Sequence, residues 1–200
     1  GKSLLELGGN NAIIISQNAN IDIAIRAAVF GAIGTAGQRC TTTRRLIIQD
    51  SIYDSFIKNL MKAYDQIIIG NPLDENNHMG PLIDKDAVGM YINALDRVKE
   101  EGGKALIEGG VLGGDAFDSG CYVKPAIYEV QNSFSVVQDE TFAPILYVMK
   151  YSTLDQAIKI QNDVPQGLSS SIMTTKISEA EEFLSSSGSD CGIANVNIGT

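Results

Sequence analysis

The feature that most constrains the fold of this 200-residue chain is the alternation of two hydrophobic patterns along it. Short runs rich in β-branched residues recur, and longer stretches with helical spacing separate them. Such alternation is typical of βα units, which place helices around a mostly parallel sheet. We therefore predict an α/β fold. The predicted strands are 12–16, 45–49, 104–108, 122–129, 145–150, 169–174 and 192–195.

Five helices are predicted between these strands. The first runs to about Gly34 from a cap at Asn20 or Asp22. One apolar face of this helix is formed by Ile23, Ala27, Phe30, Ala32 and Ile33. The second is capped by Ser51 and ends at Gly70-Asn71-Pro72, because a proline ring cannot continue a helix. The others are expected over 84–101, 154–162 and 178–185.

Composition narrows the range of partners. The chain has 15 Lys and Arg against 24 Asp and Glu, a net charge of −9, and this acidic balance argues against a nucleic-acid partner. The one basic pair, Arg44-Arg45, is too small a patch to reverse that. No apolar run approaches the ~20 residues of a membrane span. Three cysteines without a CxxC motif and a single histidine argue against a metal site and indicate reduced thiols in the cytoplasm.

The length is enough to bury a core in one domain, with two small domains as the alternative. Both ends of the chain enter patterned sequence directly, and Gly1 is not an initiator methionine. We therefore expect a piece of a longer protein.

Cys40 follows a predicted helix end bracketed by glycines and precedes a predicted strand. A thiol in such a loop can be exposed, and the cation of Arg39 would favour thiolate if its guanidinium faced the sulfur. The cysteine considered alone favours the alternative, a small buried hydrophobic side chain. A hydrolase dyad with His78 is a weaker hypothesis, because His78 lies in a polar loop. Cys121 and Cys191 have no comparable context.

Two carboxylates also have suggestive neighbours. Glu6 interrupts an apolar run just before Gly8-Gly9, so we expect it to be partly desolvated, with a raised pKa that suits a general base. The alternative is a solvated glutamate, and the two interpretations carry equal weight. Glu140 precedes Phe142 and Pro144, and the extended turn that proline favours could direct both side chains into a cleft. Phe142 alone would suggest a core residue.

Three short motifs contain these candidates: Glu6-Leu7-Gly8-Gly9-Asn10-Asn11, Gly37-Gln38-Arg39-Cys40 and Glu140-Thr141-Phe142-Ala143-Pro144. Their order and separation resemble the aldehyde dehydrogenase superfamily. The amino-acid sequence is similar to that of the antiquitin branch in segments 37–46, 142–147, 166–172 and 189–193. The antiquitin branch oxidises α-aminoadipic semialdehyde in lysine breakdown. The resemblance implies that residues 1–200 form the family's catalytic domain, a three-layer αβα structure.

The resemblance also implies catalytic roles. Cys40 would be the nucleophile that adds to an aldehyde and forms first a thiohemiacetal and then a thioester, with its own N–H as an oxyanion donor. Glu6 would activate the water that hydrolyses the thioester to a carboxylic acid. Arg39, which fits the antiquitin type, would hold the polar end of the substrate.

The implied cofactor is NAD, which accepts the hydride. The backbone at Leu7 and Gly8 would meet the nicotinamide carboxamide, Glu140 would bind the hydroxyls of the nicotinamide ribose, and Phe142 would pack beside the ring. The residues that normally choose NAD over NADP would precede Gly1, so that choice stays open. No metal is implied.

The family's cofactor-binding domain would precede the chain, and its substrate-anchoring loop and oligomerisation tail would follow Thr200. The resemblance therefore implies a homo-oligomeric full-length enzyme, and we expect the 200 residues alone to have little or no dehydrogenase turnover. Two alternatives are an inert or binding-only piece that self-associates through surfaces meant for the absent parts, and a cofactor-independent thiol esterase that needs Cys40 and Glu6.

Overall fold

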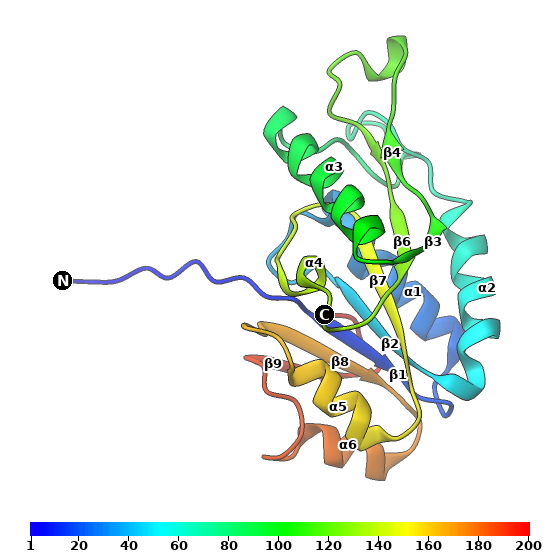
Figure 1. The fold of residues 1–200 in the computed structure, drawn as a ribbon, viewed down its shortest axis with the longest axis vertical. Helices are drawn as coiled ribbons and strands as arrows, with labels where there is room; N and C mark the ends of the chain where they lie inside the picture. Colours follow the sequence, from blue (N-terminus) through cyan, green and yellow to red (C-terminus); the bar gives the residue numbers. More distant parts are fainter.

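The computed structural model describes all 200 residues and contains a seven-stranded sheet in the order β3-β6-β7-β2-β1-β8-β9 (Figure 1). Every neighbouring pair is parallel except β3 and β6. The strands are β1 Ala12–Ile15, β2 Arg45–Gln49, β3 Lys104–Ile107, β6 Ala126–Glu129, β7 Ile145–Tyr151, β8 Ser169–Met173 and β9 Ile193–Val196. The predicted α/β class with a mostly parallel sheet is thus confirmed.

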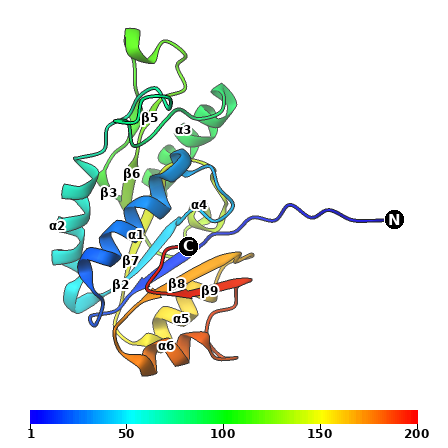
Figure 2. The ribbon, with the colours of Figure 1, turned by 180° about the vertical axis from the view of Figure 1, so that it is seen from behind.

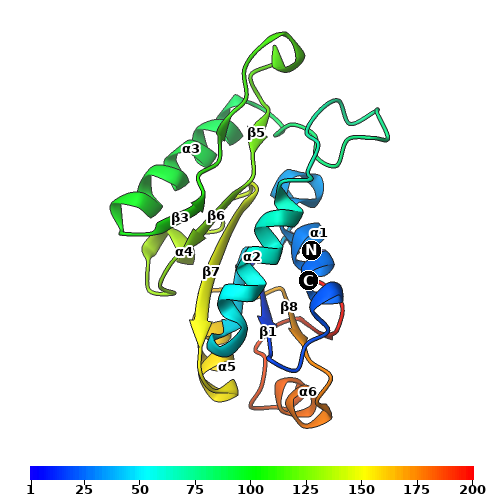
Figure 3. The same cartoon turned by 90° about the vertical axis from the view of Figure 1, so that its right-hand side faces the viewer.

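Helices cover both faces of the sheet and make three layers. The helices are α1 Ile21–Ile33, α2 Tyr53–Tyr64, α3 Lys85–Glu100, α4 Ser135–Gln138, α5 Leu154–Asn162 and α6 Ile177–Leu184. Helices α1 and α2 lie together on one face, and α3, α4 and α5 lie on the other (Figures 2 and 3). Because both faces are covered, every residue of the central strands β1 and β8 is buried, and β1 is wholly apolar.

Three predicted helices closely match the structure because local signals define them. Helix α5 has the predicted bounds, and the Thr153 side chain caps it by accepting a hydrogen bond from the Gln156 N–H. Helix α3 follows a cap in which the Asp84 carboxylate accepts from the Ala87 N–H. Helix α6 is displaced by one residue at each end from its predicted range.

Predictions for the first two helices need correction. Asn20, not Asp22, caps α1. The face that includes Ile23 and Phe30 is not the buried one, since these side chains are 46% and 67% exposed. Small residues face the sheet instead, and a Cβ on Gly31 would overlap the Thr43 side chain. The buried residues of α1 are Ala24, Ala28, Gly31, Ala32 and Ile33.

Helix α2 neither begins at a Ser51 cap nor extends to Pro72. A 3-10 turn, Asp50–Ile52, precedes it, and it ends at Tyr64. The segment that follows pairs with a distant one, since Ile68 donates its N–H to His78 Nδ1 and Ile69 forms a parallel bridge with Met79.

The predicted strand 122–129 is divided in two. Pro125, which has no N–H, separates β5 Val123–Lys124 from β6, and β5 pairs with β4 Gly110–Val111 in a small two-stranded sheet. Sequence patterns did not predict the short elements α4, the 3-10 turn Asp115–Phe117, or the 3-10 turn Gly34–Gly37.

No helix is both long enough and apolar enough to span a membrane.

Candidate functional site

The three motifs meet at one edge of the sheet, where β1, β2 and β7 begin. These strands are parallel neighbours in the order β7-β2-β1, so the segments that lead into them lie side by side. A cleft of about 600 Å³ lies between the segments. It is lined by Glu6, Leu7, Gly8, Gln38, Arg39, Cys40, Thr41, Glu140 and Phe142. All seven site residues predicted from the sequence are therefore brought together.

A tight, left-handed turn presents Cys40 at this cleft. Thr35, Ala36 and Gly37 have φ values of 55°, 52° and 72°. At Gly37 only glycine fits, because a Cβ would overlap the carbonyl of Ala143 at the start of β7. Cys40 itself is exposed and unpaired, so the alternative of a buried hydrophobic cysteine is wrong.

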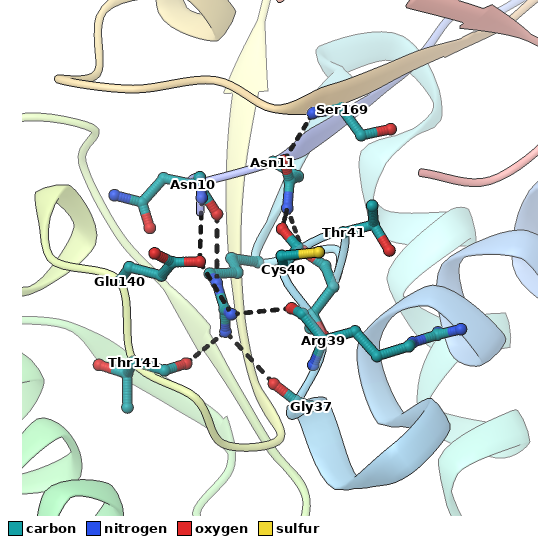
Figure 4. Close-up of polar contacts among 12 residues, drawn as sticks. Asn10, Asn11, Gly37, Arg39, Cys40, Thr41, Glu140, Thr141 and Ser169 are labelled. Atoms are coloured by element: carbon teal, nitrogen blue, oxygen red, sulfur yellow. Dashed lines mark hydrogen bonds and ion pairs between the residues drawn. The ribbon is translucent and has the colours of Figure 1, made fainter. Parts of the chain in front are cut away.

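Asn11 holds the loop that carries Cys40, residues 38–43, from beneath. Its side chain is fully buried and donates to the carbonyl oxygens of Cys40 and Thr42 over 2.8 and 2.9 Å. Its Oδ1 accepts from the N–H of Ser169 at 2.8 Å, which ties the loop to β8 (Figure 4). The Cys40 N–H, by contrast, donates to no group in the chain. The loop carbonyl is therefore fixed while the N–H stays available to a ligand.

Arg39 is directed toward α1 and not at the Cys40 sulfur (Figure 4). Its guanidinium carbon lies 5.0 Å from the centroid of the Phe30 ring, and its Nη2 donates to the Phe30 carbonyl at 3.2 Å. Arg39 also lines a second cavity of about 420 Å³, whose other walls come mainly from α1 and include His78. Arg39 is the one residue that lines both cavities. Arg39 therefore borders the site without acting on the thiol.

Glu140 bridges two of the motifs. Its Oε1 accepts from the Gly9 N–H at 2.9 Å and lies 3.5 Å from Nη2 of Arg44. A Cβ on Gly8 would overlap this carboxylate, so a larger residue there would displace the Glu140 side chain from its present position. Oε2 accepts no hydrogen bond from the chain. One carboxylate oxygen is fixed and the other is free.

Glu6 and Leu7 lie at the rim of the cleft. Both are exposed, and they belong to the extended segment that leaves the body of the molecule in Figure 1. The expected desolvation of Glu6 is thus wrong for this chain, because no packed element covers residues 1–7. Phe142 is 37% exposed, so its ring is available to a ligand.

Sequence reasoning missed Arg44, which lies under the cleft floor. It was treated as half of a surface basic pair, but Arg44 and Arg45 are 2% and 0% exposed. Burial lowers the pKa of the Arg44 guanidinium, and the neighbouring Glu140 carboxylate opposes that shift. The signal available in the sequence was two adjacent arginines at the point where a mainly apolar strand begins.

The remaining candidates do not join the site. His78 accepts a backbone hydrogen bond through Nδ1 and does not line the cleft of Cys40, so the geometry gives no support to a hydrolase dyad. Cys121 and Cys191 are partly buried and lie outside this cleft. No group of three or more His, Cys, Asp or Glu side chains is placed to bind a metal ion.

Comparison with known proteins gives matches over the whole chain. Aldehyde dehydrogenase family 7 member A1 of Pisum sativum is 49% identical over 200 residues, which is 100% of this chain and 39% of that protein. A putative homolog of that protein in Caenorhabditis elegans is 51% identical over 203 residues, 100% and 38% of the two chains. Alpha-aminoadipic semialdehyde dehydrogenase of Bos taurus is 49% identical over 202 residues, 100% and 36%. The resemblance to the antiquitin branch is confirmed.

Solved structures agree with this relationship. Betaine aldehyde dehydrogenase from Staphylococcus aureus in complex with NAD+ has a TM-score of 0.92 and 28% identity, covering 98% of this chain and 39% of that one. A 3,6-anhydro-L-galactose dehydrogenase in complex with NAP has the same TM-score and identity, covering 98% and 41%. The chain spans about two fifths of the length of these relatives. A sequence model of the aldehyde dehydrogenase family matches residues 1–200, and the chain belongs to that family.

Proposed function

We propose that residues 1–200 are the catalytic domain of an NAD-dependent enzyme that oxidises an aldehyde to a carboxylic acid, with Cys40 as nucleophile and Glu6 as general base. The observation that carries the proposal is the single cleft in which an exposed thiol, a free backbone N–H and two carboxylates lie together. The family membership supports the same chemistry.

The first step uses Cys40 alone. Its thiolate adds to the aldehyde carbon, a C–S bond forms, and the carbonyl π electrons move to oxygen. The Cys40 N–H has no partner in the chain, so it can donate to the resulting oxyanion of the thiohemiacetal. The bond from Asn11 to the Cys40 carbonyl fixes the adjacent peptide and keeps this N–H in place.

The residues around the thiol fit a nicotinamide cofactor. The free Oε2 of Glu140 suits a ribose hydroxyl, the exposed Phe142 ring suits one side of an aromatic group, and the backbone at Leu7 and Gly8 can meet a carboxamide. When bound, such a cofactor accepts a hydride from the thiohemiacetal carbon, which leaves a thioester on Cys40. The choice of NAD rests on the resemblance, since relatives have been solved with NAD+ and with NAP.

Hydrolysis of the thioester requires a base. Glu6 lines the cleft from an exposed segment, and its carboxylate can take a proton from water as the water oxygen attacks the acyl carbon. Collapse of the tetrahedral adduct breaks the C–S bond and releases the carboxylic acid and the Cys40 thiolate. Glu6 then returns its proton to solvent.

α-Aminoadipic semialdehyde is the proposed substrate, as the name of the bovine relative suggests. Arg39 supplies the charge that the polar end of such a substrate needs. Arg39 lines both the cleft of Cys40 and the second cavity, and its guanidinium lies against Phe30 of α1. We also propose that the full-length enzyme is a homo-oligomer, that it lies in the cytoplasm, and that it acts in lysine catabolism. The three unpaired cysteines support a reducing compartment.

Kinetics on the full-length enzyme test this function. We expect turnover with NAD, a higher kcat/KM for α-aminoadipic semialdehyde than for a simple aliphatic aldehyde of similar length, and loss of turnover in Cys40→Ala. Equal kcat/KM values would contradict the substrate, and faster turnover with NADP would contradict the cofactor. The isolated 200 residues should have little or no turnover, and robust oxidation by them would contradict the expected need for the rest of the enzyme.

A second role for the isolated chain follows from its surface. Large apolar side chains are exposed in the N-terminal segment, on α1, and between α2 and α3, among them Leu4, Leu5, Phe30, Leu73 and Ile83. Exposed apolar surface favours association, so we expect the isolated chain to self-associate. Light scattering across concentration tests this, and a strictly monomeric species would contradict it. Residual thiol esterase activity is a further alternative, and ester cleavage that survives Cys40→Ala would remove Cys40 from it.

A further inference from the structure

Arg44 contacts all three segments that build the cleft. Its Nε donates to the Gly9 carbonyl at 3.4 Å, in the segment that leads into β1. Its Nη2 donates to the Arg39 carbonyl at 3.2 Å, beside Cys40, and pairs with Glu140. Its Nη1 donates to the carbonyls of Gly37, at 3.5 Å, and Thr141. Figure 4 shows Gly37, Arg39, Glu140 and Thr141 arranged around this point.

The site of Arg44 is closed to water. The side chain is 3% exposed, and its guanidinium carbon lies 4.9 Å from the centroid of the Phe142 ring. A buried guanidinium needs acceptors for its planar set of N–H groups, and here the acceptors come from chain segments about 30 and 100 residues apart in sequence. Because each segment leads into a different strand, no other side chain makes this set of bonds.

We propose that Arg44 is a positioning residue, which holds the Gly9, Cys40 and Glu140 segments in one mutual arrangement and so sets the nucleophile against the carboxylate proposed to meet the cofactor. This inference rests on the proposed function for its catalytic meaning, but the arrangement it explains is independent of the chemistry. Lysine would keep the positive charge yet lose the planar fork, so Arg44→Lys separates charge from geometry.

Arg45 offers a matched control. It follows Arg44 directly as the first residue of β2, it is fully buried, and its guanidinium contacts a different set of groups. Its guanidinium donates to the Asn10 carbonyl, to Asn132 Oδ1, and to the carbonyls of Ile160 and Gln161 at the end of α5. Replacing either arginine therefore removes several buried bonds, but only Arg44 reaches the loop that carries Cys40.

The experiment compares wild type, Arg44→Lys and Arg45→Lys by amide hydrogen exchange and by alkylation with iodoacetamide. The Gly9 N–H donates a hydrogen bond to the Glu140 carboxylate, and in Arg44→Lys we expect this N–H to exchange at least tenfold faster than in the wild type. We also expect the ratio of Cys40 to Cys121 alkylation rates to fall at least fivefold. In Arg45→Lys both values should stay within twofold of wild type while exchange rises in α5.

Unchanged exchange and labelling in a folded Arg44→Lys protein would overturn the proposal, and so would equal changes in Arg45→Lys. If Arg44→Lys does not fold, amide hydrogen exchange of the native wild-type protein tests the proposal instead. If one guanidinium holds the three segments together, they should open together, and the N–H groups of Gly9, Thr42 and Ala143 should show the same free energy of opening. Three different values would refute the proposal. Failure of wild-type Cys40 to label would count against the nucleophile, while the exchange results would still test Arg44.

Discussion

Replacement of Asn11 by alanine tests whether the hydrogen bonds of this side chain hold the loop that carries Cys40. The side chain makes three hydrogen bonds from a fully buried position: two donated to the carbonyls of Cys40 and Thr42, and one accepted from the N–H of Ser169. Alanine leaves all three backbone groups without that partner. Cys40 is exposed, so water can replace the bond to its carbonyl, whereas Thr42 and Ser169 are buried.

The structure sets the magnitude of the loss. Each of the two buried orphaned groups costs about 1–3 kcal/mol, so Asn11→Ala should lower the free energy of unfolding by about 2–6 kcal/mol. Asn10 is the matched control, because it is equally buried but donates only one bond, to the Gln138 carbonyl, and its Oδ1 already has no partner. Asn10→Ala should therefore cost about 0.5–1.5 kcal/mol.

Urea unfolding followed by circular dichroism measures both values, with equal m-values as evidence that the unfolded states are comparable. A loss in Asn11→Ala that is no larger than the loss in Asn10→Ala would refute the claim that the hydrogen bonds of Asn11 support the loop. Cys40 alkylation in the same samples should change only in Asn11→Ala.

Two further predictions concern stability. Gly37→Ala should lower the free energy of unfolding, measured in urea, more than Gly102→Ala does. Both positions have positive φ, which costs a residue with a side chain about 1–2 kcal/mol, but only at Gly37 would the added Cβ also overlap other atoms. Equal losses in the two variants would contradict this. Burial raises the pKa of Glu179, but the hydrogen bonds that its carboxylate accepts outweigh burial, and the net pKa is lowered. The carboxylate therefore stabilises the fold at any pH above the pKa of glutamate in the unfolded chain, about 4.3, and this stabilisation is lost as the pH falls below that value. The advantage of wild type over Glu179→Gln in unfolding free energy should therefore be full at pH 7 and shrink below about pH 4; a constant difference would contradict the assignment of the donors, Ser16, Thr174 and Asn18.

Local signals made much of the fold predictable. Capping residues and apolar spacing lie within one element, which is why α3 and α5 were located well. The extended segment after α2 was not predictable, because its partners His78 and Met79 meet Ile68 and Ile69 from a distant part of the chain. The buried face of α1 was missed because the helix is apolar on most sides, and close approach to the sheet selects its small residues.

The same distinction applies to the site. Residues proposed to act through their own chemistry, such as Cys40 and Glu140, could be identified from motifs, and the structure brings them to one cleft. Asn11 and Arg44 could not, since their importance lies in backbone carbonyls supplied by distant segments. A pair of buried arginines at the start of a central strand looks like a basic patch until the sheet order is known.

The most direct test of the central claim is to label the folded chain with a mild thiol reagent and map the modified peptides. The structure predicts that Cys40 reacts before Cys121 and Cys191, because it alone is exposed and lies in the cleft with Glu6 and Glu140. Preferential labelling of Cys40 would support a nucleophile presented by the fold without the rest of the enzyme. Equal labelling of the three thiols, or no labelling of Cys40, would contradict it.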